Sequence, residues 1–132
     1  KIGITVGDDV KVILMEAKED HPFVQVELMM PILPLVRVPD VDQAIEMAVR
    51  VEHGNRHTAM MHSRNVEKLT KMAKLIQTTI FVKNGPSYAG IGVGGEGYTT
   101  FTIAGPTGEG LTSAKSFARR RRCVLVGGMD VR

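Results

Sequence analysis

The sequence has 132 residues and a formal net charge of +3, so it is about one domain long and only mildly basic. No apolar run approaches the roughly 20 residues that a membrane-spanning helix needs, and one cysteine excludes an internal disulfide, which suits a reducing compartment such as the cytoplasm. The small excess of positive charge, without a binding signature that contains aromatic residues, favours a solvated surface over a nucleic-acid partner.

Four short segments are rich in apolar residues, in the first of them many β-branched, which predicts strands. They cover residues 10–16, 32–38, 57–63 and 79–83. In the second segment, Pro34 cannot donate a hydrogen bond to a neighbouring strand, so we expect it at a sheet edge or a bulge.

Two segments between these strands have helical periodicity. Asp40 is a good N-cap for a helix over residues 41–51, and a second helix opens near Ser63 or Asn65 and runs to Ile76. The alternation of strands and helices predicts an α/β fold with βαβ units and a largely parallel sheet.

The amino-acid composition changes after Asn84. Glycine, threonine and proline dominate residues 85–110, which predicts an irregular cover segment, and a short helix (112–119) and a strand (123–126) follow it.

No complete catalytic, nucleotide or metal motif is evident. The glycine run at 92–100 lacks both the spacing and the Gly-Lys-Ser/Thr ending of a phosphate loop. The run at 105–110 precedes a predicted helix, where backbone N–H groups could bind an anion, but a turn-rich cover segment is favoured for both runs. His57 and His62 are five residues apart on a predicted strand, so their side chains lie on opposite faces and cannot form one metal site.

Two single residues raise questions of chemistry. Glu27 follows apolar residues, so we expect it to be partly buried and to need a backbone N–H, an arginine or a ligand hydroxyl as partner. Cys123 follows the four arginines of residues 119–122, which could activate a thiolate, could bind a nucleic acid, or could simply precede a strand.

Three stretches, "RHTA" at 56–59, "IFVKNGPS" at 80–87 and "GPTGEGLTSA" at 105–114, resemble the CoA-acylating aldehyde dehydrogenases of bacterial microcompartments for propanediol or ethanolamine use. The resemblance covers nearly the whole chain and implies an aldehyde-dehydrogenase-like α/β fold, in which a cysteine thiolate attacks a short-chain aldehyde, NAD accepts the hydride, and CoA takes the acyl group. It also implies a location in the cytoplasm, inside a microcompartment.

The resemblance sets further expectations for the parts of the chain. It implies that residues 1–110 are the C-terminal part of the catalytic region and that residues 111–132 are a short helix and an oligomerisation strand. It places the catalytic cysteine in a motif that this sequence lacks, so Cys123 starts the interface strand and the 132 residues alone should be inactive. The alternative is an assembly module without activity.

Candidate site residues follow from the resemblance as well. Glu27 and Pro31 match a Glu-x-Phe-Gly-Pro motif that holds the nicotinamide ribose of NAD, although Met29 and Met30 replace the phenylalanine and the glycine and put an aromatic wall in doubt. His57 and Thr58, in "HTA", match a feature of acylating members and are expected on the CoA side of the site.

Overall fold

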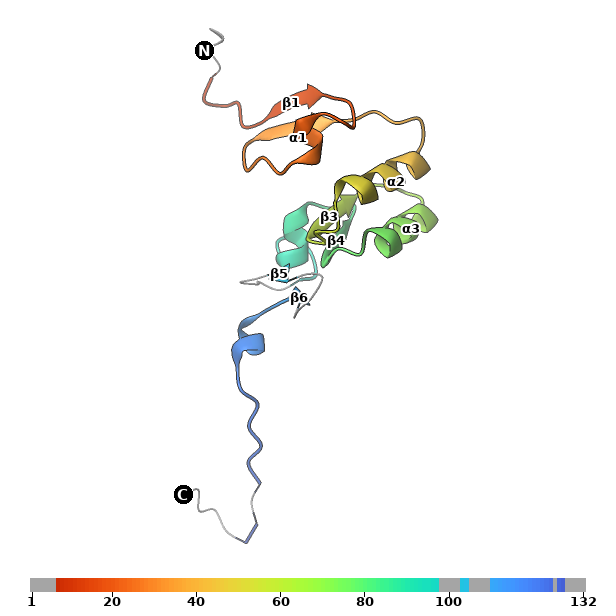
Figure 1. The fold of residues 1–132 in the computed structure, drawn as a ribbon. Coiled ribbons are helices and arrows are strands. Elements are labelled where there is room, and N and C mark those ends of the chain that lie inside the picture. Colours follow the sequence, from red (N-terminus) through yellow and green to blue (C-terminus); the bar gives the residue numbers. More distant parts are fainter. Residues whose placement is uncertain (1–6, 98–102, 105–109, 125, 128–132) are drawn as a thin grey trace.

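The computed structural model describes residues 7–97, 103–104, 110–124 and 126–127. Seven helices and strands occupy residues 13–83 (Figure 1). In chain order they are β1 (Ile13–Glu16), α1 (Pro22–Gln25), β2 (Ile32–Leu35), α2 (Val41–Val51), β3 (Thr58–Met61), α3 (Val66–Ile76) and β4 (Ile80–Lys83). The 3-10 turn η1 (Ser87–Ile91), the strands β5 (Ile103–Ala104) and β6 (Gly110–Leu111), and the 3-10 turn η2 (Ala114–Phe117) follow.

The predicted parallel pairing is confirmed. β1 pairs with β2 and β3 pairs with β4, both in parallel, with α1 and α3 in the respective connections. In the described residues these pairs form two separate two-stranded sheets, and β5 and β6 form an antiparallel pair. Strand β1 begins at Ile13 rather than at Val10, because the ladder starts only where the N–H of Ile13 bonds to the carbonyl of Pro31.

Both long helices begin as the sequence predicts. The Asp40 side chain accepts from the N–H of Gln43 at 2.9 Å, and the Asn65 side chain accepts from the N–H of Lys68 at 3.0 Å. Each cap satisfies a backbone donor that the first turn of a helix leaves without a partner.

The core lies between these helices and one face of the β3–β4 sheet. Ile45 of α2 and Met72 and Ile76 of α3 are buried against one another and against Ala59 and Phe81 of the sheet. The opposite face of this sheet is covered by η1, where Gly90 packs so close to Ile80 that a Cβ would collide with it. The short η1 turn, which the sequence reading missed, therefore completes a third layer.

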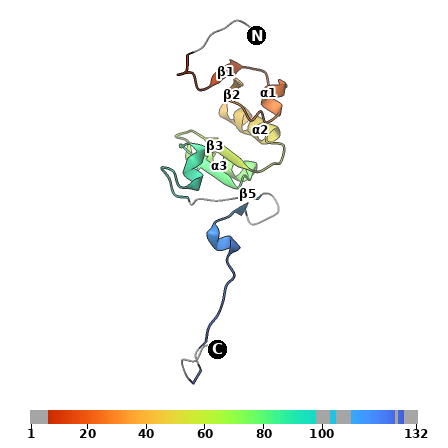
Figure 2. The ribbon, with the colours of Figure 1, turned by 90° about the vertical axis from the view of Figure 1, so that its left-hand side faces the viewer.

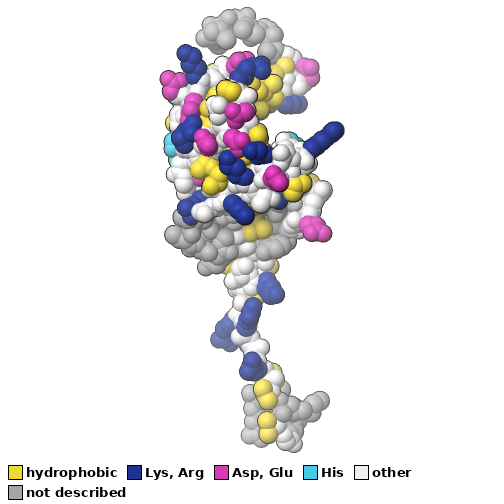
Figure 3. Space-filling model, turned by 90° about the vertical axis from the view of Figure 1, so that its right-hand side faces the viewer, with side chains coloured by type: hydrophobic (Ala, Val, Ile, Leu, Met, Phe, Trp, Pro, Cys, Tyr) yellow, Lys and Arg dark blue, Asp and Glu magenta, His cyan; other side chains and the backbone are white. Residues whose placement is uncertain are grey.

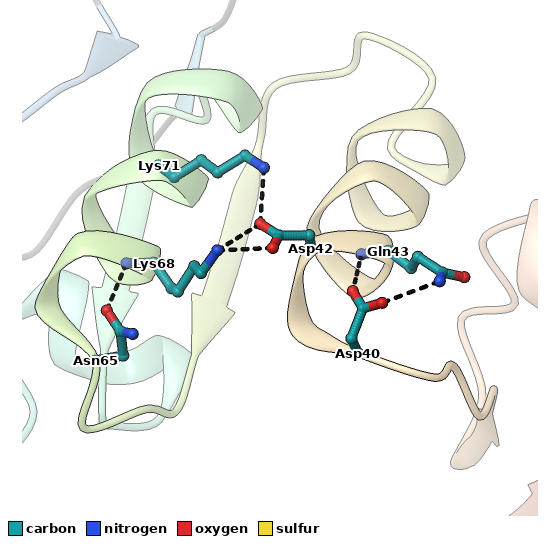
Figure 4. Close-up of polar contacts among 6 residues, drawn as sticks. All are labelled: Asp40, Asp42, Gln43, Asn65, Lys68 and Lys71. Carbon is teal, nitrogen blue, oxygen red and sulfur yellow. Dashed lines mark hydrogen bonds and ion pairs between the residues drawn. The ribbon is translucent and has the colours of Figure 1, made fainter.

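An ion-pair cluster joins α2 and α3 at the rim of this core. The carboxylate of Asp42 accepts from Lys68 Nζ at 2.7 Å and from Lys71 Nζ at 2.8 Å (Figure 4). The hydrogen bond from Lys68, which has the larger effect, and the hydrogen bond from Lys71 together lower the pKa of Asp42 to about 2. The cluster thus fixes how the two helices lie side by side.

The β1–β2 sheet has one exposed apolar face. Its register places Leu14, Leu33 and Leu35 on the same face, and all three are exposed. Pro34 is on the other face, toward α2. Both strands of a two-stranded sheet are edge strands, which agrees with the edge position predicted for Pro34.

The C-terminal part differs from the sequence prediction. The expected helix over 112–119 is only the 3-10 turn η2, and the described residues of the expected strand, Cys123, Val124 and Val126, are not in a strand. A strand requires a hydrogen-bonding neighbour, and the described part of this single chain supplies none here. From η2 the chain runs away from the other elements (Figures 1 and 2) with its arginines exposed (Figure 3).

Candidate functional site

A cavity of about 570 Å³ brings together most of the candidate residues. One wall consists of α1 and the residues after it, and the other consists of the end of α2, the following loop and the start of β3. The lining residues are Val24, Gln25, Val26, Glu27, Val51, Glu52, His53, Asn55, His57 and Thr58. Glu27, His57 and Thr58 are therefore assembled at one site, whereas Pro31 is not among the lining residues.

The first wall depends on the short helix α1. The Nδ1 atom of His21 accepts from the N–H of Phe23 at 3.1 Å and caps the helix, and Pro22 suits its first position. The sequence reading missed α1 because four residues are too few to show helical periodicity. Glu27 lies just past the C-cap residue of this helix, Val26.

The expected partial burial of Glu27 is wrong, because its side chain is exposed. It follows a helix rather than a buried strand, so the apolar residues before it do not cover it. Within the described residues its carboxylate has no hydrogen-bond or ion-pair partner. An exposed carboxylate on a cavity wall can accept hydrogen bonds from a ligand without first losing an internal partner.

The second wall contains a loop with unusual backbone conformations. His53, Gly54 and Arg56 all have positive φ, at 55°, 76° and 53°. The carboxylate of Glu52 accepts from the N–H of Arg56, and the N–H of Asn55 bonds to the carbonyl of Glu52. Glu52 thus holds a strained loop closed.

His57 follows that loop and is fixed by its neighbour. Its Nδ1 lies 2.7 Å from Oγ1 of Thr58, and the N–H of Ile80 bonds to its carbonyl. The contact to Thr58 occupies one ring nitrogen and limits rotation of the imidazole. Nε2 is then the ring nitrogen that a ligand can use.

Asn84 organises the end of the "IFVKNGPS" stretch. With a left-handed φ of 57°, it follows β4, and its side chain accepts from the N–H of Ser63 at 2.7 Å and donates to the carbonyl of Ser63 at 3.0 Å. Beyond it, a Cβ at Gly97 would collide with the backbone of Gly90. Close backbone packing therefore explains at least this glycine, while residues 105–109 lie outside the described part.

Three further features of the described residues concern a nucleophile at the cavity, a metal site and a membrane-spanning helix. Cys123 is exposed and does not line the cavity. In the ranges that the structure describes, no group of three His, Cys, Asp or Glu side chains could hold a metal ion, and no helix has the length and hydropathy to cross a membrane.

Comparison with known proteins identifies relatives. The profile of the aldehyde dehydrogenase family matches residues 11–110. The acetylating acetaldehyde dehydrogenase EutE of Salmonella typhimurium is 56% identical over 130 residues, which are 98% of this chain and 28% of that protein. The chain thus spans little more than a quarter of the length of this relative.

Two solved structures also resemble the chain. Propionaldehyde dehydrogenase of Rhodopseudomonas palustris, with bound CoA and an acylated cysteine, is 77% identical with a TM-score of 0.86, over 94% of this chain and 28% of that one. An engineered glycolyl-CoA reductase with bound NADP⁺ is 77% identical with a TM-score of 0.85, over 93% of this chain and 28% of that one.

Proposed function

Because the chain belongs to the aldehyde dehydrogenase family, we propose that it is the C-terminal portion of an NAD-dependent, CoA-acylating dehydrogenase for a short-chain aldehyde, propionaldehyde or acetaldehyde. The observation that carries the proposal is the cavity that Glu27 lines from one wall and His57 and Thr58 from the other. The names of the relatives support both the aldehyde and the use of CoA.

Glu27 is proposed to hold the cofactor. The cofactor supplies a hydride acceptor when it is bound, and its ribose hydroxyls are donors that suit an exposed carboxylate to which the described residues give no partner. The cavity has room for part of such a molecule. Because Pro31 is absent from the lining, its proposed contribution is to shape the chain after Glu27.

His57 and Thr58 are proposed to serve the CoA side. The hydroxyl of Thr58 orients the imidazole through Nδ1, which leaves Nε2 to bond to the acyl or thiol end of CoA. A cysteine thiolate bonds to the aldehyde carbon; with NAD bound, the adduct would lose its hydride to the cofactor and its hydroxyl proton to a base. The resulting acyl group passes to the sulfur of CoA, whose thiol gives up its proton, as the cysteine thiolate leaves. We assign this nucleophile to a part of the protein outside the 132 residues, because Cys123 is exposed and away from the cavity.

A second proposed role is assembly. Phe117, Val124 and Val126 are 67%, 69% and 87% exposed, on a segment that extends away from the other elements. An extended segment with apolar residues, to which the described part of the chain supplies no neighbouring strand, can join the sheet of another subunit. We propose that residues 111–132 form this oligomer contact, that residues 1–110 belong to the catalytic region, and that the enzyme works in the cytoplasm, inside a microcompartment, as the resemblance implies.

One experiment on the full-length protein tests the assignment of the two walls. In Glu27→Gln we expect the dissociation constant of NAD to rise by about tenfold, since a neutral amide loses about 1–2 kcal/mol of charge assistance in the bond to ribose. In His57→Ala we expect NAD binding and the aldehyde burst to persist while thioester transfer to CoA slows. Unchanged NAD binding in Glu27→Gln, or equal losses of both half-reactions in His57→Ala, would contradict the assignment.

A further inference from the structure

An ion pair connects the two walls of the cavity. Arg50 lies in the last turn of α2, directly before the lining residues Val51 and Glu52. Its guanidinium donates to both carboxylate oxygens of Glu19, with Nε–Oε1 at 3.0 Å and Nη2–Oε2 at 3.1 Å. Glu19 belongs to the segment between β1 and α1. The pair therefore joins the element that carries one wall to the segment that leads into the other.

The link continues from Glu19 into the first wall. The side-chain amide of Gln25, a lining residue of α1, donates to the backbone carbonyl of Glu19 at 2.5 Å. Glu27 lies two residues further on. A bidentate arginine–carboxylate pair fixes orientation as well as distance, so a shift of α2 is transmitted through Glu19 and Gln25 to the segment that carries Glu27.

We propose that Arg50 is a positioning residue, which sets the separation between Glu27 and the opposite wall and so adjusts the cavity to the dinucleotide. The proposal depends on the proposed function, because it takes Glu27 as the residue that contacts the ribose. Hydrogen bonding with Arg50 lowers the pKa of Glu19, and the same bond raises the pKa of Arg50, so both groups stay charged at neutral pH.

The chain offers a matched control. Arg37 pairs with Glu16 at the same Nε–Oε1 distance of 3.0 Å, but through one nitrogen, and neither residue lines the cavity between Glu27 and His57. The Arg37→Ala change also removes an arginine side chain and breaks an exposed ion pair, in this case the pair between the end of β1 and the residues after β2. It does not touch the connection between the two walls.

The test compares Arg50→Ala, Arg50→Lys and Arg37→Ala in the full-length protein. Exposed ion pairs are weak, so we expect Arg50→Ala to raise the dissociation constant of NAD by only about threefold. Arg50→Lys keeps the positive charge but loses the two-nitrogen contact of the guanidinium, so its dissociation constant for NAD should lie between those of Arg50→Ala and the wild type. The dissociation constant of Arg37→Ala should match that of the wild type. Hydrogen exchange without ligand should be faster at the amides of residues 23–26 in Arg50→Ala, less so in Arg50→Lys, and unchanged in Arg37→Ala.

Two outcomes would each overturn a defined part of the proposal. If Arg50→Ala matches Arg37→Ala in both NAD affinity and hydrogen exchange while Glu27→Gln weakens binding, the positioning role is wrong and the cofactor site stands. If Glu27→Gln leaves NAD binding unchanged, the cofactor assignment of this wall is wrong, and the positioning role is wrong with it.

Discussion

Asn84 provides a test of how the loop after β4 is held. Asn84→Ala removes the two hydrogen bonds with Ser63, at about 1 kcal/mol each, because the side chain both accepts from its N–H and donates to its carbonyl. Alanine must also keep the left-handed φ of 57°, which costs about 1 kcal/mol more. Since Asn84 is exposed, water replaces part of the lost bonding, and the expected loss of unfolding free energy is about 2–3 kcal/mol.

Asn84→Gly separates the two contributions. Glycine loses the same hydrogen bonds but adopts positive φ without strain, so it should be more stable than Asn84→Ala by up to about 1 kcal/mol. Urea-induced unfolding of the full-length variants, followed by circular dichroism, gives the comparison. Equal stabilities of the alanine and glycine variants would refute the backbone argument, and a wild-type stability in both would refute the role of the hydrogen bonds.

Two further predictions concern charge and assembly. The pKa of Asp42 is held at about 2, below its ordinary value of 3.8, so its contribution to stability is present above about pH 4 and is lost as the pH falls toward 2. The difference in melting temperature between the wild type and Asp42→Asn should therefore be constant from pH 5 to 8 and shrink steadily as the pH falls from about 4 toward 2; a difference that grows on acidification would contradict the ion-pair cluster with Lys68 and Lys71. Truncation after Arg122 should reduce the oligomer in light scattering, whereas Cys123→Ser should leave assembly and catalysis intact. Normal assembly of the truncated protein would count against the interface, and a folded but inactive Cys123→Ser would identify Cys123 as a nucleophile.

The sequence predicts the two long helices well, since each has a polar cap and enough turns for an apolar stripe to be visible. Asp40 and Asn65 are confirmed as caps, and the helices end where the stripes end. Short elements are less predictable. Helix α1 and turn η1 are stabilised by local contacts, such as the His21 cap, that leave no periodic pattern.

The candidate site residues were proposed from the sequence, but their arrangement could not be predicted from it. Glu27, His57 and Thr58 came from the family resemblance, and nothing in their spacing shows that they line one cavity. The exposure of Glu27 could not be predicted, because it depends on α1. The contact of Glu52 with the loop at Arg56, and the contact of Arg50 with Glu19 on which its proposed role rests, appear only in the folded chain.

The extended segment after η2 also has a consequence for the protein's susceptibility to proteolytic cleavage. Arg119–Arg122 are exposed, and the described residues from 119 to 124 have no secondary structure. Trypsin-like enzymes cut after arginine and bind their substrates in an extended form, so this segment has both the sequence and the backbone shape of a cleavage site. A cut there would separate Val124 and Val126 from the rest of the chain. A chain that has lost them keeps the cavity at Glu27 and His57, and resistance to limited digestion would then support the proposed contact of this segment with another subunit.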